Sequence, residues 1–553
     1  MTADLAGVLT IVALIGFLAL CYVPLGDYLA AVLTPTRHSR AERVTYRLLG
    51  VNPDNQQSTA SYVLATIGFS LAGLVILFLI LVGQGALPFS RGLPGMPWDM
   101  AFNTAASFVG NTNWQSYAGE STLGYTAQMA GLAVQNFVSA ATGIAVFAAV
   151  VRGFLALRTD VLGNFWVDLI RICYRLLLPI SVIGAVILLA SGVIQNFAPD
   201  LVITTVAGGQ QTIPGGPVAS QEVIKLLGTN GGGFFNANSA HPFESPNGFS
   251  NLFEIFLILV IPFCLPRTLG TMLKNQKQGL AVLAAMAILW LTATALTVWS
   301  ELSRLGAAPQ LAGAAMEGKE VRFGVWATGI FAAATTGTST GAVNGMHDSF
   351  TAPGGGVVLL NMLLGEVSPG GVGSGIYSML VMAVLATFIA GLMVGRTPEF
   401  LGKKIGAREM TYVALYVLIM PVCVLVGTAV AIALPDTPDA MANSGIHGFS
   451  EVVYAYASAA NNNGSAFAGI TVTSTFFQVT LGLAILIGRF VPMVLILALA
   501  GSVARAGIVP KTSGTLPTHT PLFIGLLVGE VLLVTGLTFF PTLALGPIAE
   551  ALL

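Results

Sequence analysis

Four short segments rich in glycine, asparagine, threonine and serine interrupt an otherwise apolar sequence: residues 111–115, 229–233, 335–344 and 461–465. Their starts lie roughly 120, 110 and 125 residues apart, an interval typical of a repeated structural unit. Residues without bulky side chains let the backbone turn and face inward, and backbone carbonyls replace the water around a cation. Four such loops around one axis predict a ring of carbonyl oxygens that binds a dehydrated cation.

For any one of these segments taken alone, the alternative is an ordinary surface turn, because glycine and asparagine are common in turns. Each segment, however, lies between a short apolar stretch and a long one. Polar loops at membrane depth are tolerated only where protein buries them or where they line a water-filled path. Four segments in the same context therefore favour a pore over four unrelated turns.

Apolar helices must position these loops. The 553 residues are 55% hydrophobic and 8% charged, whereas soluble domains carry about 25% charged residues. Ten stretches reach the length of about 20 residues that crosses a bilayer: 7–31, 60–82, 126–150, 176–196, 250–266, 280–300, 376–395, 411–434, 474–499 and 521–547. Four more are too short or too interrupted to cross, and each ends at a polar loop: 98–109, 219–228, 324–334 and 449–460.

This order predicts an all-α polytopic membrane protein with ten transmembrane helices. Four pseudo-repeated units, each a helix, a pore helix, a filter loop and a helix, surround one pore, with one extra helix at each end. The predicted segments are an N-terminal extra helix at 1–35, pore units at 58–152, 176–270, 280–396 and 411–500, and a C-terminal helix at 518–553. In the third unit the second helix is predicted to be broken.

The basic residues set the orientation. Seventeen of the 23 lysines and arginines lie in five segments: 35–58, 152–175, 267–278, 396–408 and 500–520. The positive-inside rule places these segments in the cytoplasm. An even number of crossings then separates them, so both termini and all four loops lie on the outer side of the membrane. Asp99, Glu222 and Glu451 lie near the starts of three short helices, where an acid suits the positive end of the dipole.

The loop sequences are distinctive: NTNWQ, TNGGGFFNANSAHPFE, TGAVNGMHDSFTAPGG and NNNGSAFAG. They resemble the filter segments of the potassium-binding, channel-like subunit of the Kdp potassium-transporting P-type ATPases, and the resemblance covers essentially the whole chain. It implies four pore units related to potassium channels and to Trk/Ktr/HKT transporters. It also implies partners: a separate ATP-hydrolysing subunit and small accessory single-span subunits, with membrane lipids around them.

The resemblance assigns potassium binding, with rejection of sodium, to specific residues. The predicted filter residues are Asn111, Thr112, Asn113 and Gln115, then Thr229, Asn230 and Gly231, then Ser339, Thr340 and Gly341, and finally Asn462, Asn463 and Gly464. In the first loop, Trp114 stands where the other loops have glycine, which leaves the register of that loop open. The bound species is the transported potassium ion itself.

Two charged residues in apolar surroundings predict that ion passage is controlled on the cytoplasmic side of the filter. Arg489 lies inside a long apolar run, where a cation costs at least ~2.5 kcal/mol unless it faces protein or water. It either snorkels to the interface or lies beneath the filter, where it would repel a second potassium ion. Glu366, Gly370 and Gly371 lie in a glycine-rich break at 365–375, which is either a surface linker or an intramembrane gate.

Other chemistry is missing from the sequence. Residues 313–319 match the start of a P-loop, but Glu320 follows where Ser or Thr would hold Mg²⁺, so we expect no ATP to bind. The five histidines are scattered, and no catalytic site is predicted. A net charge of −1 gives no reason to expect a nucleic-acid partner. The alternatives are a stand-alone Trk/Ktr-type transporter driven by ion gradients and, from another class, a membrane-embedded transferase.

Overall fold

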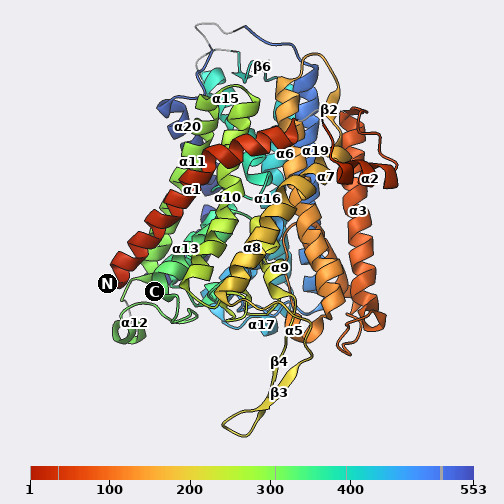
Figure 1. Cartoon of the computed structure of the whole chain (residues 1–553). Coiled ribbons are helices and arrows are strands. Elements are labelled where there is room, and N and C mark those ends of the chain that lie inside the picture. The colour runs from red at the N-terminus through yellow and green to blue at the C-terminus, as the bar shows by residue number, and fades with distance from the viewer. Residues whose placement is uncertain (1, 35–36, 305–306, 394, 396, 511–514) are drawn as a thin grey trace.

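The computed structural model describes the whole chain except residues 1, 35–36, 305–306, 394, 396 and 511–514. Within that part, ten helices are long and apolar enough to cross a membrane, which confirms the predicted number (Figure 1). Six are single α-helices: α1 (Ala3–Leu33), α10 (Gly248–Met272), α11 (Gln276–Glu301), α15 (Ser374–Met393), α16 (Ala407–Ile432) and α19 (Thr475–Arg505).

The other four spans are composite. They are α3 (Thr59–Gly83) with a 3₁₀ turn, α6 (Val134–Leu155) after a π-helical stretch, α7 (Phe165–Arg171) joined to α8 (Leu178–Ser191), and α20 (Pro521–Leu543) followed by α21 (Ala549–Leu552). The two chain ends lie near the same end of the molecule in Figure 1, as ten crossings require.

Four shorter helices end just before the polar loops: α4 (Trp98–Val109), α9 (Val218–Leu227), α13 (Gly324–Gly337) and α18 (Gly445–Ala460). The last turn of each is buried. These helices match the four short stretches expected from the sequence, and α4 matches at both ends. Each therefore directs its C-terminal carbonyls toward a loop.

The remaining helices are short: α2 (Arg40–Leu48), α5 (Gly119–Thr122), α12 (Ala307–Ala312), α14 (Ala352–Leu363) and α17 (Thr437–Ala440). Three antiparallel strand pairs connect spans: β1 (Gln57–Ser58) with β2 (Val161–Gly163), β3 (Leu201–Thr204) with β4 (Gln210–Ile213), and β5 (Glu399–Phe400) with β6 (Lys403–Lys404). The β3–β4 hairpin projects from one end of the molecule (Figure 1).

The centre of the bundle is α6, in which every residue from Ser139 to Val151 is buried. Small side chains allow this, because Gly143 and Gly153 approach the backbone of Val372 and Ala500 closely. Around it, α1, α3 and α16 present exposed leucine, isoleucine and valine, the surface that a bilayer covers. The division of these spans into four pseudo-repeats stays a prediction.

Candidate functional site: a ring of four loops

In each of the four loops a triplet of residues repeats one backbone pattern. The first and third residues have positive φ and the second does not: 61° and 51° at Asn111 and Asn113, 47° and 77° at Thr229 and Gly231, 54° and 81° at Ser339 and Gly341, and 56° and 96° at Asn462 and Gly464. Alternating left- and right-handed residues turn successive peptide groups the same way, so N–H groups lie on one side and carbonyls on the other.

This backbone is costly to hold. Left-handed φ is unfavourable for residues with a Cβ, and most of all for a β-branched residue such as Thr229. Each such residue costs of order 1–3 kcal/mol and persists only where surrounding structure fixes it. Five of the eight positive-φ positions are not glycine. Strain repeated at the same position of four loops indicates a functional conformation.

The loops meet one another in a closed cycle. A Cβ atom on Gly231 would overlap the Thr340 carbonyl, one on Gly341 that of Asn463, and one on Gly464 that of Thr112. The fourth contact is a hydrogen bond of 2.7 Å from Asn113 Nδ2 to the Gly231 carbonyl. Loop two therefore touches three, three touches four, four touches one and one touches two. The predicted residues other than Gln115 form this ring.

Side-chain amides hold the ring from behind. Asn111 Nδ2 donates to the Thr229 carbonyl at 2.9 Å, and Asn463 Nδ2 donates to the Thr335 carbonyl at 2.9 Å. Asn462 Nδ2 donates to the Ile485 carbonyl at 2.9 Å and so ties loop four to α19. Eleven of the twelve triplet residues are buried, and Gly464 is partly exposed. The amides therefore hold the backbone of the loops in place.

The structure settles the register of the first loop. Asn113, not Trp114, occupies the position of Gly231, Gly341 and Gly464. Gln115 lies outside the triplet, and its Oε1 accepts the Gly233 N–H at 2.8 Å. The sequence placed Gln115 in the filter itself, whereas it braces loop two beside the outer cavity. The side chain of Asn113 makes the difference, because its amide bridges Gly231 and Asn136.

Two cavities, an outer and an inner one, border residues of the ring. The outer one, of about 420 Å³, is lined by residues of all four loops: Asn113 and Gln115, Gly232, Gly341, and Gly464. The inner one, of about 100 Å³, is lined by Asn461 and Asn462 together with residues of α15, α16, α19 and α20.

Arg489 and Glu366 both line the inner cavity. They are 3% and 6% exposed, and neither forms a salt bridge within the described residues. Arg489 Nη2 and Glu366 Oε1 have no hydrogen-bond partner there. Arg489 lies in the middle of α19, so it does not reach the interface by snorkelling. The guanidinium of Arg489 therefore keeps its charge beside the cavity without a direct ion pair, although the carboxyl group of Glu366 lines the same cavity.

The segment between α14 and α15 lies directly under two of the loops. Gly370 N donates to the Gly337 carbonyl at 2.7 Å, and Val372 N donates to Thr229 Oγ1 at 3.0 Å. A Cβ on Gly371 would lie 2.9 Å from Ser339 Oγ. The glycine-rich break is therefore buried against the ring and is not a surface linker.

A family model described as potassium-transporting ATPase A subunit matches residues 12–552. This chain belongs to that family. It is similar to proteins named potassium-transporting ATPase potassium-binding subunit: 59% identical in Kineococcus radiotolerans, over 99% of this chain and 98% of the relative, and 59% in Streptomyces coelicolor, over the full length of both. The relative from Mycobacterium avium is 57% identical over the full length of both chains.

Among solved structures, the potassium transporter TrkH from Vibrio parahaemolyticus resembles this chain with a TM-score of 0.51. The likeness covers 89% of this chain and 97% of that one at 14% sequence identity. At this identity the comparison concerns the fold alone. It shows that this chain shares the fold of TrkH.

Two buried lysines form ion pairs next to loops two and three. Lys225 Nζ lies 2.7 Å from Glu222 and 2.5 Å from Glu244, and Glu244 Oε1 accepts the Phe235 N–H at 2.7 Å. Behind loop three, Lys319 pairs with Glu301 at 2.7 Å. Sequence analysis missed both pairs, although a lysine within the apolar stretch 218–227 was a visible signal.

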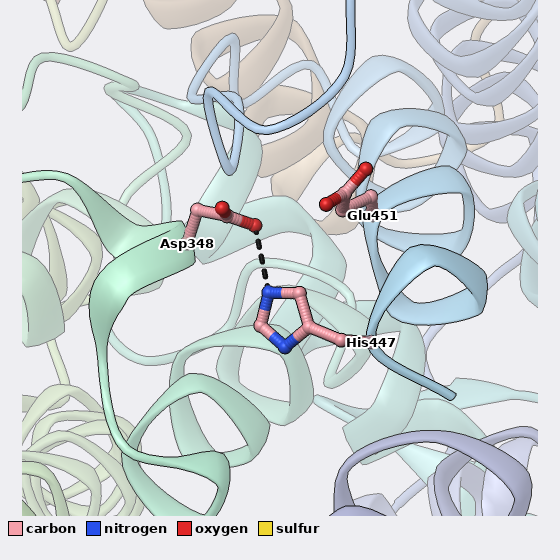
Figure 2. A group of neighbouring side chains, drawn as sticks. All are labelled: Asp348, His447 and Glu451. Atoms are coloured by element: carbon pink, nitrogen blue, oxygen red, sulfur yellow. Dashed lines mark hydrogen bonds and ion pairs between the residues drawn. The ribbon is translucent and has the colours of Figure 1, made fainter. Parts of the chain in front are cut away.

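A second cluster lies at the outer rim: Asp348, His447 and Glu451 (Figure 2). These residue types ligate metals, and the candidate ligand atoms lie within 4.8 Å of one another. However, both ring nitrogens of His447 contact carboxylates, Asp348 at 2.9 Å and Glu550 at 2.8 Å. Glu451 already accepts three N–H groups of Ala442 and Asn443. The arrangement therefore fits a protonated imidazole held between two carboxylates, which we call the His447 clamp. Hydrogen bonding to Asp348 raises the pKa of His447 to about 9.

Proposed function

We propose that this chain binds potassium from the outer side in the four-loop ring and passes it toward an ATP-hydrolysing subunit of a high-affinity uptake complex. The observation that carries the proposal is the closed ring of alternating-φ triplets, which borders two cavities. Aligned carbonyls replace the hydration shell of an alkali cation without adding fixed charge. The names of the full-length relatives supply potassium as the ion.

The short helices support a cation at the centre. Each of α4, α9, α13 and α18 ends at its loop, so the negative ends of four helix dipoles converge on the ring. Beneath it, Arg489 opposes a second cation in the inner cavity, and the segment 364–373 closes the direct path inward. Release then requires movement of that segment, with Gly370 and Gly371 supplying the freedom.

The proposal assigns one orientation of the chain in the membrane. The arginine-rich segments face the cytoplasm, and both termini, the outer cavity and the β3–β4 hairpin face the periplasm. ATP is hydrolysed by a separate subunit, and potassium is this chain's substrate. The alternative function is that of a stand-alone transporter driven by ion gradients, and the fold shared with TrkH is compatible with it.

Two measurements test the proposal. Purification from native membrane in mild detergent should yield a large ATPase subunit together with this chain, and ATP hydrolysis by that assembly should require potassium. Rubidium soaked into crystals of the assembly should give anomalous density inside the ring. Gradient-driven flux through the purified chain alone would favour the alternative function, and rubidium density away from the ring would overturn the assignment of the site.

A further inference from the structure

The short helix α2 carries two exposed faces that the pore does not use. Arg40, Arg43 and Arg47 are all exposed, and no carboxylate pairs with any of them among the described residues. At 100° per residue they fall within a sector of about 60°. Val44 and Leu48 occupy the next sector and are 55% and 81% exposed. A row of free arginines thus borders an exposed apolar strip.

The third face fixes α2 to the bundle. Glu42 is fully buried, and its Oε2 accepts Arg175 Nη2 at 2.6 Å. Tyr46 packs edge-to-face on His38 and clusters with Val167 and Ile170 of α7. A capping box at Ser39 starts the helix. Because the docking face holds α2 rigidly, the arginines and the apolar strip keep a fixed direction, outward from the protein.

The level of α2 corresponds to a membrane interface. It lies crosswise at the edge of the bundle (Figure 1) and packs on α7. Leu64, near the start of α3, is 72% exposed. Tyr174, which is half-exposed, shares a hydrogen bond of 3.0 Å with Thr45 of α2. The half-exposed Tyr28 donates to the Arg175 carbonyl at 2.7 Å, next to the Glu42 contact. Tyrosines with one polar end are enriched at the headgroup level of bilayers.

We propose that α2 is an interfacial helix that binds anionic phospholipid headgroups of the cytoplasmic leaflet. The arginine row pairs with lipid phosphates, and Val44 and Leu48 enter the acyl boundary. Charge complementarity selects this occupant, since guanidinium groups bind phosphate through two parallel hydrogen bonds. The strip beside the arginines suits a lipid surface, in which an amphipathic helix lies flat. The inference rests on the orientation given under the proposed function.

The test uses the full complex in nanodiscs containing equal amounts of phosphatidylglycerol and phosphatidylcholine. After mild detergent extraction, native mass spectrometry counts the lipids retained. The wild type should retain phosphatidylglycerol in preference to phosphatidylcholine. The triple variant Arg40→Gln, Arg43→Gln, Arg47→Gln should lose this preference, by as much as a hundredfold in affinity, because each arginine near an anionic surface contributes about fivefold. Leu48→Gln should weaken retention without a change of charge.

The matched control removes three exposed cytoplasmic charges elsewhere: Arg158→Gln, Lys404→Gln and Arg408→Gln. It should retain lipid as the wild type does, and thermal unfolding should show that both triple variants fold. Equal phosphatidylglycerol retention by the α2 variant and the wild type would overturn the proposal. So would loss of the ATPase subunit with unchanged lipid, which would make α2 a protein-docking helix. Lipid retention is measured without potassium, so failure of the ring assignment would leave this result unaffected.

Discussion

Gly341 and Asn463 belong to different loops, yet a methyl group on Gly341 would overlap the Asn463 carbonyl oxygen. The same relation links Gly231 to Thr340 and Gly464 to Thr112. Each glycine therefore does two things: it adopts a left-handed φ, and it lets a neighbouring carbonyl approach. The loops can therefore close into a ring only because these three positions carry no side chain.

Gly341→Ala should weaken potassium binding by at least about tenfold, because the new methyl group must push the Asn463 carbonyl from its place and each 1.4 kcal/mol lost is tenfold. The measurement is the potassium concentration that half-maximally stimulates ATP hydrolysis by the purified complex. Gly445→Ala is the matched control. Gly445 also has positive φ, 71°, but nothing lies within 4 Å of its added Cβ.

The control separates two costs. Both substitutions strain a left-handed residue, and only Gly341→Ala places an atom in the ring. Potassium dependence should therefore shift in the first variant and stay near the wild type in the second. An identical shift in both would mean that backbone strain alone, rather than the close approach to Asn463, governs the effect.

Much of this architecture follows from local sequence. The apolar spans and the stretch 98–109, which is α4, are set by composition and length, so their positions could be predicted closely. The register of the first loop could not, because Asn113 takes the left-handed conformation that glycine takes in the other loops. The residue type alone does not predict this conformation, and Gly231, whose carbonyl accepts the hydrogen bond from the Asn113 amide, is 118 residues away in the sequence.

Long-range pairing sets the same limit elsewhere. Asp348 and His447 are 99 residues apart, and scattered histidines gave no reason to join them. Lys225 and Glu244 lie on either side of the second loop in the sequence, and only the folded chain shows that the ammonium of Lys225 pairs with two carboxylates. Composition identifies elements, whereas the partners of buried charges depend on how the elements pack.

Arg489→Gln should increase potassium flux that is not coupled to ATP hydrolysis. A unit charge about 8 Å from an ion repels it by about 2 kcal/mol at an effective dielectric constant of about 20, so its removal raises cavity occupancy up to about thirtyfold. The measurement is rubidium uptake into vesicles with and without ATP. Arg408→Gln, at an exposed arginine near Tyr412, is the control and should leave coupling intact. If coupling is unchanged in Arg489→Gln, Arg489 does not limit potassium occupancy of the inner cavity.

Lys225→Met should destabilise the subunit by about 3–5 kcal/mol, because Glu222 and Glu244 would stay buried without their cation. Thermal unfolding in detergent measures the change. Lys274→Met, at an exposed lysine, should have little effect. Adding Glu244→Gln to Lys225→Met should recover part of the loss, since one buried negative charge is then removed. If the double variant is no more stable than the single one, charge burial is not the source of the effect.

The His447 clamp should make stability depend on pH in the alkaline range. Asp348 and Glu550 flank its ring nitrogens, Glu451 lies beside Asp348, and the pKa of His447 is raised from 6.5 to about 9. A raised pKa in the folded state means that the stabilisation is fully present below pH 6.5 and is lost as the pH rises through 9. Because the imidazole is partly exposed, its contribution is on the order of 1–2 kcal/mol.

The comparison of wild type with His447→Gln over pH 6 to 10 tests this clamp. Thermal unfolding should show the wild type more stable at pH 6.5, and the difference should shrink to nothing near pH 10. His241→Gln is the control, since burial lowers the pKa of that histidine from 6.5, away from the alkaline range in which His447 loses its proton. A wild-type advantage that persists unchanged at pH 10 would show that the imidazole acts through packing on Phe467, with which it stacks, and not through its charge.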